Sequence, residues 1–386
     1  MIKMLTAHTY ELDDIDLAIE EIKSQIDSSK FLKNSVGMVS CHADFITEGI
    51  TDALCEAFDF PIFGQTCKAA ADKNVISSEV LILTVLTSDD AEFNIAVTEP
   101  ANSDMAENLQ VLYKDTGAKT ELPIKLVYIG LPLLVNVGGD FFVNTLNAVL
   151  DGAPLFGGVA VDHTADYRSS QLFYGKSHFS DRAIIMVISG NLNPKFFTAD
   201  LGGREVYRDK AVVTEARGNK IITVNGMKAT DFLEMIGIKR NEDGGFIGLN
   251  MCNLMVDYGD GSKPVVRAVF AETPDGEIIT GGEIPQGAMI TISYIETDDI
   301  EKADRKMAEQ IKASGDFDLM LCCSCIGRYF NLAYDAEQEM KFITDEFGDE
   351  KDFVFSYVGG EICPVETLDG KLVNRCHNQT FITCLI

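Results

Sequence analysis

The C-terminal stretch Ser356-Tyr-Val-Gly-Gly-Glu-Ile-Cys-Pro364 holds the features from which the fold of this chain can be read. The apolar run 353–358 predicts a strand, and the glycine pair after it permits a turn or a close backbone approach. The carboxylate of Glu361 follows at once, and a second polar run, His377-Asn-Gln-Thr380, precedes the closing predicted strand 381–386. Polar side chains between two apolar strands need hydrogen-bond partners or a ligand. The stretch therefore predicts either a hydrogen-bonded turn that closes a sheet or a binding site.

The order of predicted elements that leads to this stretch occurs three times. In residues 1–90 the periodicity predicts strand, helix, strand, helix, strand and strand, and residues 91–190 repeat this order. Three pairs of residues share one separation along the chain: Gly37 and Gly130, Pro61 and Pro154, and Gly64 and Gly157. The third copy is predicted to begin with a strand at 288–295, and its Ser324-Cys325 and Gly359 match Ser40-Cys41 and Gly64 of the first.

The middle of the chain has a different pattern. Short strand-like runs between 191 and 286 are separated by turn sequences such as Asn225-Gly226 and Pro274-Asp-Gly276, which predicts antiparallel hairpins. The predicted fold class is therefore α/β, with mixed sheets flanked by helices, built from about three copies of a β-α-β-α-β-β unit with an antiparallel β-rich insert. The predicted division is two repeated units in 1–190, a β-rich part in 191–287 and a third unit in 288–386.

Composition excludes several classes of partner. The 386 residues include 32 Lys and Arg against 60 Asp and Glu, a formal charge of −28. This charge argues against nucleic acid and against anionic membrane surfaces, and it is compatible with a cationic or zwitterionic ligand. The longest apolar stretch, 126–139, is interrupted by Pro132 and is too short to span a bilayer. We expect a cytoplasmic protein without a signal peptide or membrane insertion, and the sequence leaves an oligomer open.

The ten cysteines do not predict a metal site or a disulfide framework. Cys322-Cys323-x-Cys325 lacks the paired spacing that zinc prefers, and the histidines show no ligand spacing. The chain has neither a Gly-x-Gly-x-x-Gly motif nor a P-loop, so we expect no metal and no cofactor.

One thiol is a candidate nucleophile. Cys325 lies where a predicted strand ends, and Arg328 follows, a cation that could lower the thiol pKa. Together with His377 and Glu361 it would form a set for nucleophilic catalysis in a hydrolase or transferase. The alternative is that Cys325 is simply a small residue at a crowded strand end, and we favour a protein that is not an enzyme.

Several motifs together resemble the FIST family, which has an N-terminal and a C-terminal FIST region. They are Gly152-Ala-Pro-Leu-Phe-Gly-Gly158, Ser189-Gly-Asn-Leu192, Val213-Thr-Glu-Ala-Arg-Gly-Asn219, Asn225-Gly226, Val265-Val-Arg267, Ile284-Pro-Gln-Gly287, Ser324-Cys-x-x-Arg328, Gly360-Glu361 and His377-Asn-Gln-Thr380. The resemblance implies a sensory module for signal transduction that binds small ligands, amino acids among them. Such modules usually adjoin output domains, and none fits within this chain, so we expect a free-standing copy that acts on a separate signalling protein.

The favoured hypothesis is a small-ligand-binding sensor, and a structural or oligomeric partner protein is a third alternative. Arg328 would bind the carboxylate of a zwitterion and Glu361 its amine. The predicted ligand-binding residues are Ser324, Cys325, Arg328, Gly360, Glu361, His377, Asn378 and Gln379.

Overall fold

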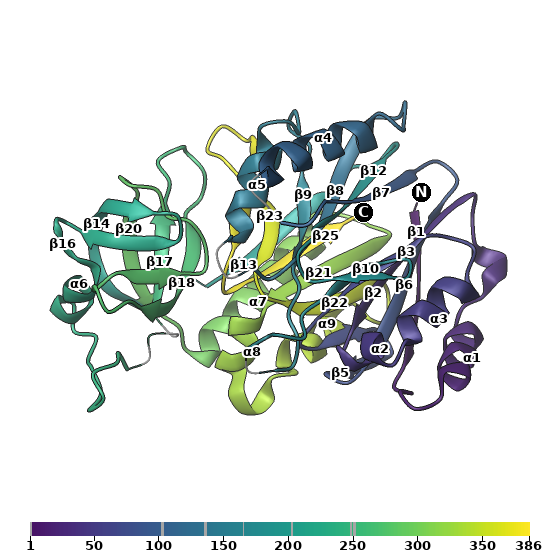
Figure 1. Cartoon of the computed structure of the whole chain (residues 1–386), viewed down its shortest axis with the longest axis horizontal. Coiled ribbons are helices and arrows are strands. Elements are labelled where there is room, and N and C mark those ends of the chain that lie inside the picture. Colours follow the sequence, from purple (N-terminus) through teal and green to yellow (C-terminus); the bar gives the residue numbers. More distant parts are fainter. Residues whose placement is uncertain are drawn as a thin grey trace.

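The computed structural model describes residues 2–101, 104–134, 137–164, 166–201, 204–247, 249 and 252–386. It shows a large α/β body with a smaller β barrel at one end (Figure 1). Mixed sheets flanked by helices and an antiparallel β-rich insert are both present, so the predicted fold class is confirmed.

The first unit forms one sheet with helices on one face. Its elements are β1 (Ile2–Thr9), α1 (Ile15–Gln25), β2 (Asn34–Cys41), α2 (Asp44–Thr47), α3 (Ile50–Ala57), β3 (Ile62–Thr66) and β6 (Leu81–Ser88). The strands lie in the order β1-β6-β2-β3, with β2 and β3 parallel. The side chain of Asp14 accepts a hydrogen bond from the Leu17 amide and so starts α1 as an N-cap. Ala18 and Ile22 of this helix are fully buried, which ties it to the sheet.

The second and third units have the same order of strands. The second contains β7 (Glu92–Val97), α4 (Met105–Gly117), β8 (Ile124–Leu131), α5 (Gly139–Asn147), β9 (Leu155–Val159) and β12 (Ile184–Ser189), arranged β7-β12-β8-β9. The third contains β13 (Lys195–Asp200), α7 (Thr297–Ala313), β21 (Leu319–Cys325), α8 (Ile326–Leu332), α9 (Gln338–Phe347), β22 (Asp352–Val358) and β25 (Thr380–Leu385), arranged β13-β25-β21-β22.

The first strand of the third unit differs from the predicted one. We expected 288–295, but β20 (Met289–Tyr294) pairs with strands of the barrel, and β13 pairs with β25 instead. The barrel is therefore inserted between the first strand and the first helix of the third unit. The local sequence of β20 has the strand pattern that we expected, but its hydrogen-bonded partners, which place it in the barrel, decide to which sheet it belongs.

Each unit also gives a hairpin to another unit. The hairpin β4 (Ala70–Asp72)–β5 (Val75–Ser77) of the first unit pairs with β22 of the third. The hairpin β10 (Leu172–Tyr174)–β11 (Ser177–Phe179) of the second pairs with β3 of the first. The hairpin β23 (Glu361–Glu366)–β24 (Leu372–His377) of the third pairs with β9 of the second. This cyclic exchange links all three sheets.

The exchanged hairpins correct one predicted correspondence. In each hairpin, the first residue of the first strand pairs with the receiving sheet at one position, which is Gln65, Gly158 or Ser356. These three positions are therefore equivalent. Phe355, the residue before Ser356, then corresponds to Gly64. Gly359 was expected there, but it lies beyond β22 in the turn to β23, because β22 runs on to Val358.

The inserted barrel is antiparallel throughout. Its elements are β14 (Arg204–Arg217), β15 (Lys220–Val224), β16 (Met227–Lys228), α6 (Ala229–Met235), β17 (Cys252–Asp257), β18 (Val265–Glu272), β19 (Ile278–Thr280) and β20. The strands follow the order β14-β20-β17-β18-β19-β15, and pairing of β14 with β15 closes the barrel. It has its own apolar core, which includes Val213, Leu254 and Ile292.

The inner faces of the three α/β sheets share one apolar core. Met38 and Phe63 of the first sheet, Phe156 of the second, and Leu321 and Val354 of the third belong to the same buried cluster. No helix in the described part of the chain combines the length and the apolar character that a membrane crossing requires.

Candidate functional site

The predicted site residues lie where β21, β22 and β24 end. Ser324 and Cys325 end β21, Arg328 is on α8, and Gly360 and Glu361 follow β22. His377 ends β24 directly opposite Glu361, and Asn378 and Gln379 form the turn into β25. All eight residues are buried. The structure thus gathers these segments, but it does so inside the protein rather than at an open surface.

Arg328 belongs to an internal polar network. Its Nε donates to Glu339 Oε1 at 2.8 Å, its Nη2 contacts Asp304, and its Nη1 donates to the Ala199 carbonyl at 3.0 Å. Ser324 Oγ and the Tyr357 hydroxyl donate to Glu339 Oε2 at 3.1 and 2.8 Å. A ligand carboxylate would have to displace one of these carboxyl groups to reach Arg328, and breaking a buried pair is costly.

Glu361 and Cys325 face each other in an environment that favours their neutral forms. Glu361 Oε2 accepts a hydrogen bond from the Thr380 amide at 3.4 Å, and the buried Oε1 has no hydrogen-bond partner in the described part of the chain. Burial raises the pKa of Glu361 well above its ordinary value. Burial and then the neighbouring Glu361 raise the pKa of the Cys325 thiol in the same way. A thiol that holds its proton is a poor nucleophile.

His377 is not positioned as a base for Cys325. Its Nε2 lies 3.0 Å from the Cys363 carbonyl, and its Nδ1 has no hydrogen-bond partner. Burial lowers the pKa of His377, which keeps the ring neutral. The three residues of the catalytic alternative therefore occupy one region without the chain of hydrogen bonds that a nucleophile–base pair needs.

Asn378 and Gln379 connect this region to its surroundings. Asn378 Oδ1 accepts a hydrogen bond from the Ala268 amide of the barrel at 3.4 Å. Gln379 Oε1 accepts one from Asn331 Nδ2 of α8 at 3.2 Å. Gln379 has a φ of 55°, a conformation in which a side chain other than that of glycine is strained. Such strain often marks functional sites.

An open cavity of about 660 Å³, which we call the barrel cleft, lies next to these residues. It separates the barrel from the second unit. Of the eight predicted site residues, only Gly360 is among the described residues that line it. The lining residues are Pro132, Leu133, Leu134, Val137, Gly138, Gly139, Val159, Asp166, Tyr167, Arg168, Ser170, Ser180, Asp181, Asn219, Phe270, Ile279, Thr280, Gly281, Gly359, Gly360 and Cys376.

The chemistry of the barrel cleft suits a small amphipathic ligand. Phe270 supplies an aromatic face with 61% of its surface exposed. The lining carries both signs of charge, with Arg168 in an exposed ion pair with Asp166 and with Asp181 as a further carboxylate. The buried Ser170 Oγ has no hydrogen-bond partner among the described residues. Tyr167 has a φ of 53°, a second strained position. Ligand pockets typically measure about 300–1,000 Å³ and combine apolar walls with a few polar groups.

Sequence reasoning missed this cleft because its walls come from distant segments. The second unit, the barrel and the turn after β22 each contribute a part. One signal was available: residues 166–174 stand out as an extra segment in the second copy of the repeat.

A buried arginine joins the barrel to the α/β body at the inner end of this interface. Arg267 of β18 is fully buried, and its Nη2 lies 2.8 Å from Asp140 Oδ1 and 2.6 Å from the Tyr258 hydroxyl. Its Nη1 donates to the Cys376 carbonyl at 2.7 Å. In the sequence, Arg267 appeared only as part of a family-like motif.

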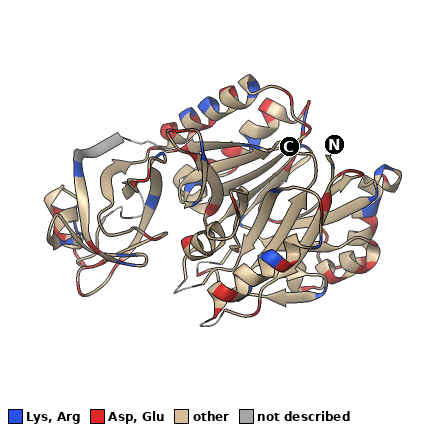
Figure 2. Cartoon of the chain, turned by 90° about the horizontal axis from the view of Figure 1, so that it is seen from above, with Lys and Arg blue, Asp and Glu red and all other residues tan. Residues whose placement is uncertain are grey.

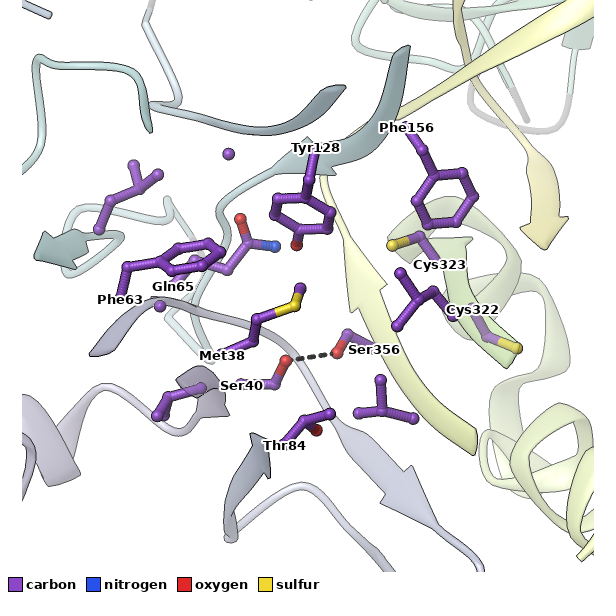
Figure 3. Close-up of a pocket in the computed structure, with 16 residues that line it drawn as sticks. Met38, Ser40, Phe63, Gln65, Thr84, Tyr128, Phe156, Cys322, Cys323 and Ser356 are labelled. Atoms are coloured by element: carbon purple, nitrogen blue, oxygen red, sulfur yellow. Dashed lines mark hydrogen bonds between the residues drawn. The ribbon is translucent and has the colours of Figure 1, made fainter. Parts of the chain in front are cut away.

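A second, enclosed pocket lies where the three sheets meet (Figure 3). Ser356 and Ser40 are joined by a hydrogen bond of 2.7 Å, while Gln65 Oε1 and Thr84 Oγ1 lack partners. Its volume of about 20 Å³ is enough for a water molecule and too small for a metabolite. The described residues form no cluster that could hold a metal ion.

Comparison with known families agrees with this architecture. The model of the FIST N domain matches residues 35–227, and that of the FIST C domain matches residues 229–364. The chain therefore belongs to the FIST family, whose domains are sensory domains of signal-transduction proteins. The boundary between the two matches falls inside the barrel, within β16 and directly before α6. No curated protein matches the chain.

Proposed function

We propose that this FIST protein is a cytosolic sensor that binds a small ligand, an amino acid or a similar zwitterion, in the barrel cleft. The observation that carries the proposal is the cleft itself, about 660 Å³ between two bodies of one chain. Clefts between domains are frequent ligand sites, because closing them around a ligand changes the relative position of the two bodies.

A zwitterion fits the charges of the cleft. Arg168 is a donor for a carboxylate, which would replace its exposed partner Asp166 at little cost, and Asp181 is an acceptor for an amine. Gly359 and Gly360 belong to the wall, and Phe270 offers an apolar surface for a side chain. Gly360 would contact the ligand directly. The other seven predicted residues would lie behind the wall and support it. Arg328 and Glu361 would then stay buried and would not contact the ligand.

Ligand binding would be transmitted through the joint between the barrel and the α/β body. Across this joint Arg267 contacts Asp140 and Cys376, and Asn378 contacts Ala268, while Tyr258 holds the Arg267 guanidinium from the barrel side. A ligand that contacts both sides would favour one arrangement of the joint over others. A separate signalling protein would then recognise that arrangement.

A ligand screen with a cleft-filling variant tests the proposal. We expect at least one of the twenty amino acids or their close metabolites to raise the Tm of the wild type in a thermal-shift assay. Gly138 lines the cleft, and a Cβ added there meets no atom of the described residues within 4 Å, so Gly138→Leu should fold and fill part of the cleft. It should weaken binding about tenfold or more.

Gly245 provides the matched control, because a Cβ there meets only the side chain of Asn241, at 3.8 Å, and the residue lies in a turn of the barrel away from the cleft. Gly245→Leu should bind like the wild type. No stabilising amino acid in the screen, or equal binding by both leucine variants, would contradict the proposal.

A further inference from the structure

The first strand of the third unit lies at an unoccupied edge of its sheet. Among the strands that the structure describes, β13 pairs with β25 alone and stands first in the order β13-β25-β21-β22-β4-β5. An edge strand presents backbone N–H and C=O groups to whatever lies beside it. Beside β13 lies a groove of about 730 Å³, and all residues from Pro194 to Asp200 line it.

The groove has the shape of a slot between two layers. On one side are Ala303, Lys306, Met307 and Gln310 of α7, and on the other the hairpin residues Pro364, Val365, Glu366 and Leu372. A strand added to β13 would therefore be covered on both faces, as the interior strands of this sheet are. The apolar side chains of the two walls favour burial of an apolar segment. Leu372 is 46% exposed in the free protein.

The charges around the slot contrast with those of the whole molecule. Acidic residues are spread over the helices and loops of both bodies (Figure 2), and the formal charge of the chain is −28. The slot instead contains three lysines, Lys195, Lys263 and Lys306, against Asp200 and Glu366. Lys195 Nζ is held by the Ser314 carbonyl at 2.6 Å, whereas Lys263 and Lys306 are exposed. Exposed lysines beside an edge strand attract acidic groups.

We propose that this slot binds an extended, acidic segment of a partner protein, which adds to β13 as a further strand. Backbone hydrogen bonds to β13 would supply affinity, as in other cases of strand addition. Apolar residues in the middle of the segment would lie between α7 and the β23–β24 hairpin, and acidic residues would contact Lys263 and Lys306. Because Lys263 belongs to the barrel, a movement of the barrel would change this site.

The probe is a fluorescein-labelled peptide of sequence Glu-Glu-Val-Ile-Val-Thr-Glu-Glu, titrated with the full chain and followed by fluorescence anisotropy. We expect saturable binding, and binding about tenfold or more weaker for the peptide with Lys in place of every Glu. Hydrogen exchange of the β13 amides should slow in the complex.

Two isomers of the acidic peptide, N-methylated at alternate residues, test strand addition itself. Only the isomer that blocks the N–H groups facing β13 should lose binding, since the other keeps every hydrogen bond to that strand. Lys263→Glu combined with Lys306→Glu should weaken binding of the acidic peptide about tenfold or more. The matched control, Lys23→Glu with Lys119→Glu, changes the net charge equally at exposed positions on α1 and after α4, outside the slot, and should leave most of the binding intact.

The proposal is overturned if the wild type binds neither peptide, or if it binds the acidic and basic peptides equally. Equal binding of the two N-methylated isomers contradicts the addition of the peptide as a strand to β13. Equal effects of the two lysine pairs would mean that the whole surface attracts the acidic peptide, which contradicts a site at the slot.

Discussion

The carboxyl group of Glu361 is fully buried in the α/β body. One of its oxygens has no hydrogen-bond partner, and burial raises its pKa well above the ordinary value. A carboxyl group that is neutral when folded and charged when unfolded binds more protons in the folded state. Its contribution to stability is therefore complete at pH below its unfolded pKa and is lost as the pH rises through its folded pKa.

Replacing Glu361 by Gln should remove this dependence. The free energy of unfolding of Glu361→Gln, measured with urea, should approach or exceed that of the wild type as the pH rises from about 5 to 8. The gap between the two proteins should change by at most about 1.4 kcal/mol per pH unit. Glu366→Gln, at an exposed position, is the control and should run parallel to the wild type. Parallel curves for Glu361→Gln would mean that this carboxyl is charged in the folded protein.

Cys325 should be unreactive in the folded protein, because it is 5% exposed and its pKa is raised by burial and by Glu361. Cys55 is the internal control: it is half-buried, and burial raises its pKa to about 11. With iodoacetamide, labelling of Cys55 should increase as the pH approaches 11, while Cys325 stays unlabelled until the chain unfolds. Rapid labelling of Cys325 near pH 7 would revive the catalytic alternative.

At the scale of elements, close contact between paired strands determines where glycine is required. Gly157 of β9 has a φ of 150°, and a Cβ there would meet the Ile129 carbonyl oxygen of β8. Its counterpart Gly64 in β3 is also crowded, by Val39 of β2 and by Phe173. The hairpin of the third unit pairs with β9 directly at Gly157 and Gly158. A side chain at Gly157 would push β9 away from β8 and would so disturb the strand with which the hairpin of the third unit pairs.

Gly157→Ala should lower the free energy of unfolding by about 3 kcal/mol or more, because both the backbone conformation and the space exclude a Cβ. Gly138→Ala, where φ is −77° and the added atom meets nothing, should change stability by less than about 0.5 kcal/mol. Thermal or urea unfolding of the two variants decides this. Similar stabilities for the two variants would show that β8 and β9 can move apart freely.

The order of the elements was predictable, because periodicity and turn residues are local properties of the sequence. The strand 288–295 was predicted as a strand and assigned to the wrong sheet, since its pairing with β14 and β17 depends on segments far away in the chain. The exchange of hairpins between units could not be predicted from the sequence for the same reason. The polar turn at His377 was recognised, whereas the barrel cleft, the Arg267 joint and the slot beside β13 arise only when separate segments meet.

At the scale of the whole molecule, three linked sheets form a base against which the barrel is placed. The cyclic exchange of hairpins ties each unit to another, so the α/β body should act as one rigid part. The barrel is connected through β13 and α7 and through polar contacts such as Arg267–Asp140. Ligand in the barrel cleft would contact both parts, and a partner strand at β13 would lie close to the connection between them.

Hydrogen exchange with and without a saturating amino acid from the screen tests the central claim, binding in the barrel cleft, most directly. The account predicts that exchange slows in 277–283 on the barrel side and in 356–361 on the other side, because both segments contribute to the cleft wall. Exchange in 241–247, a distant part of the barrel, should not change. Slower exchange at 324–328 with no change at 277–283 would place the ligand in the buried cluster instead and would contradict the account.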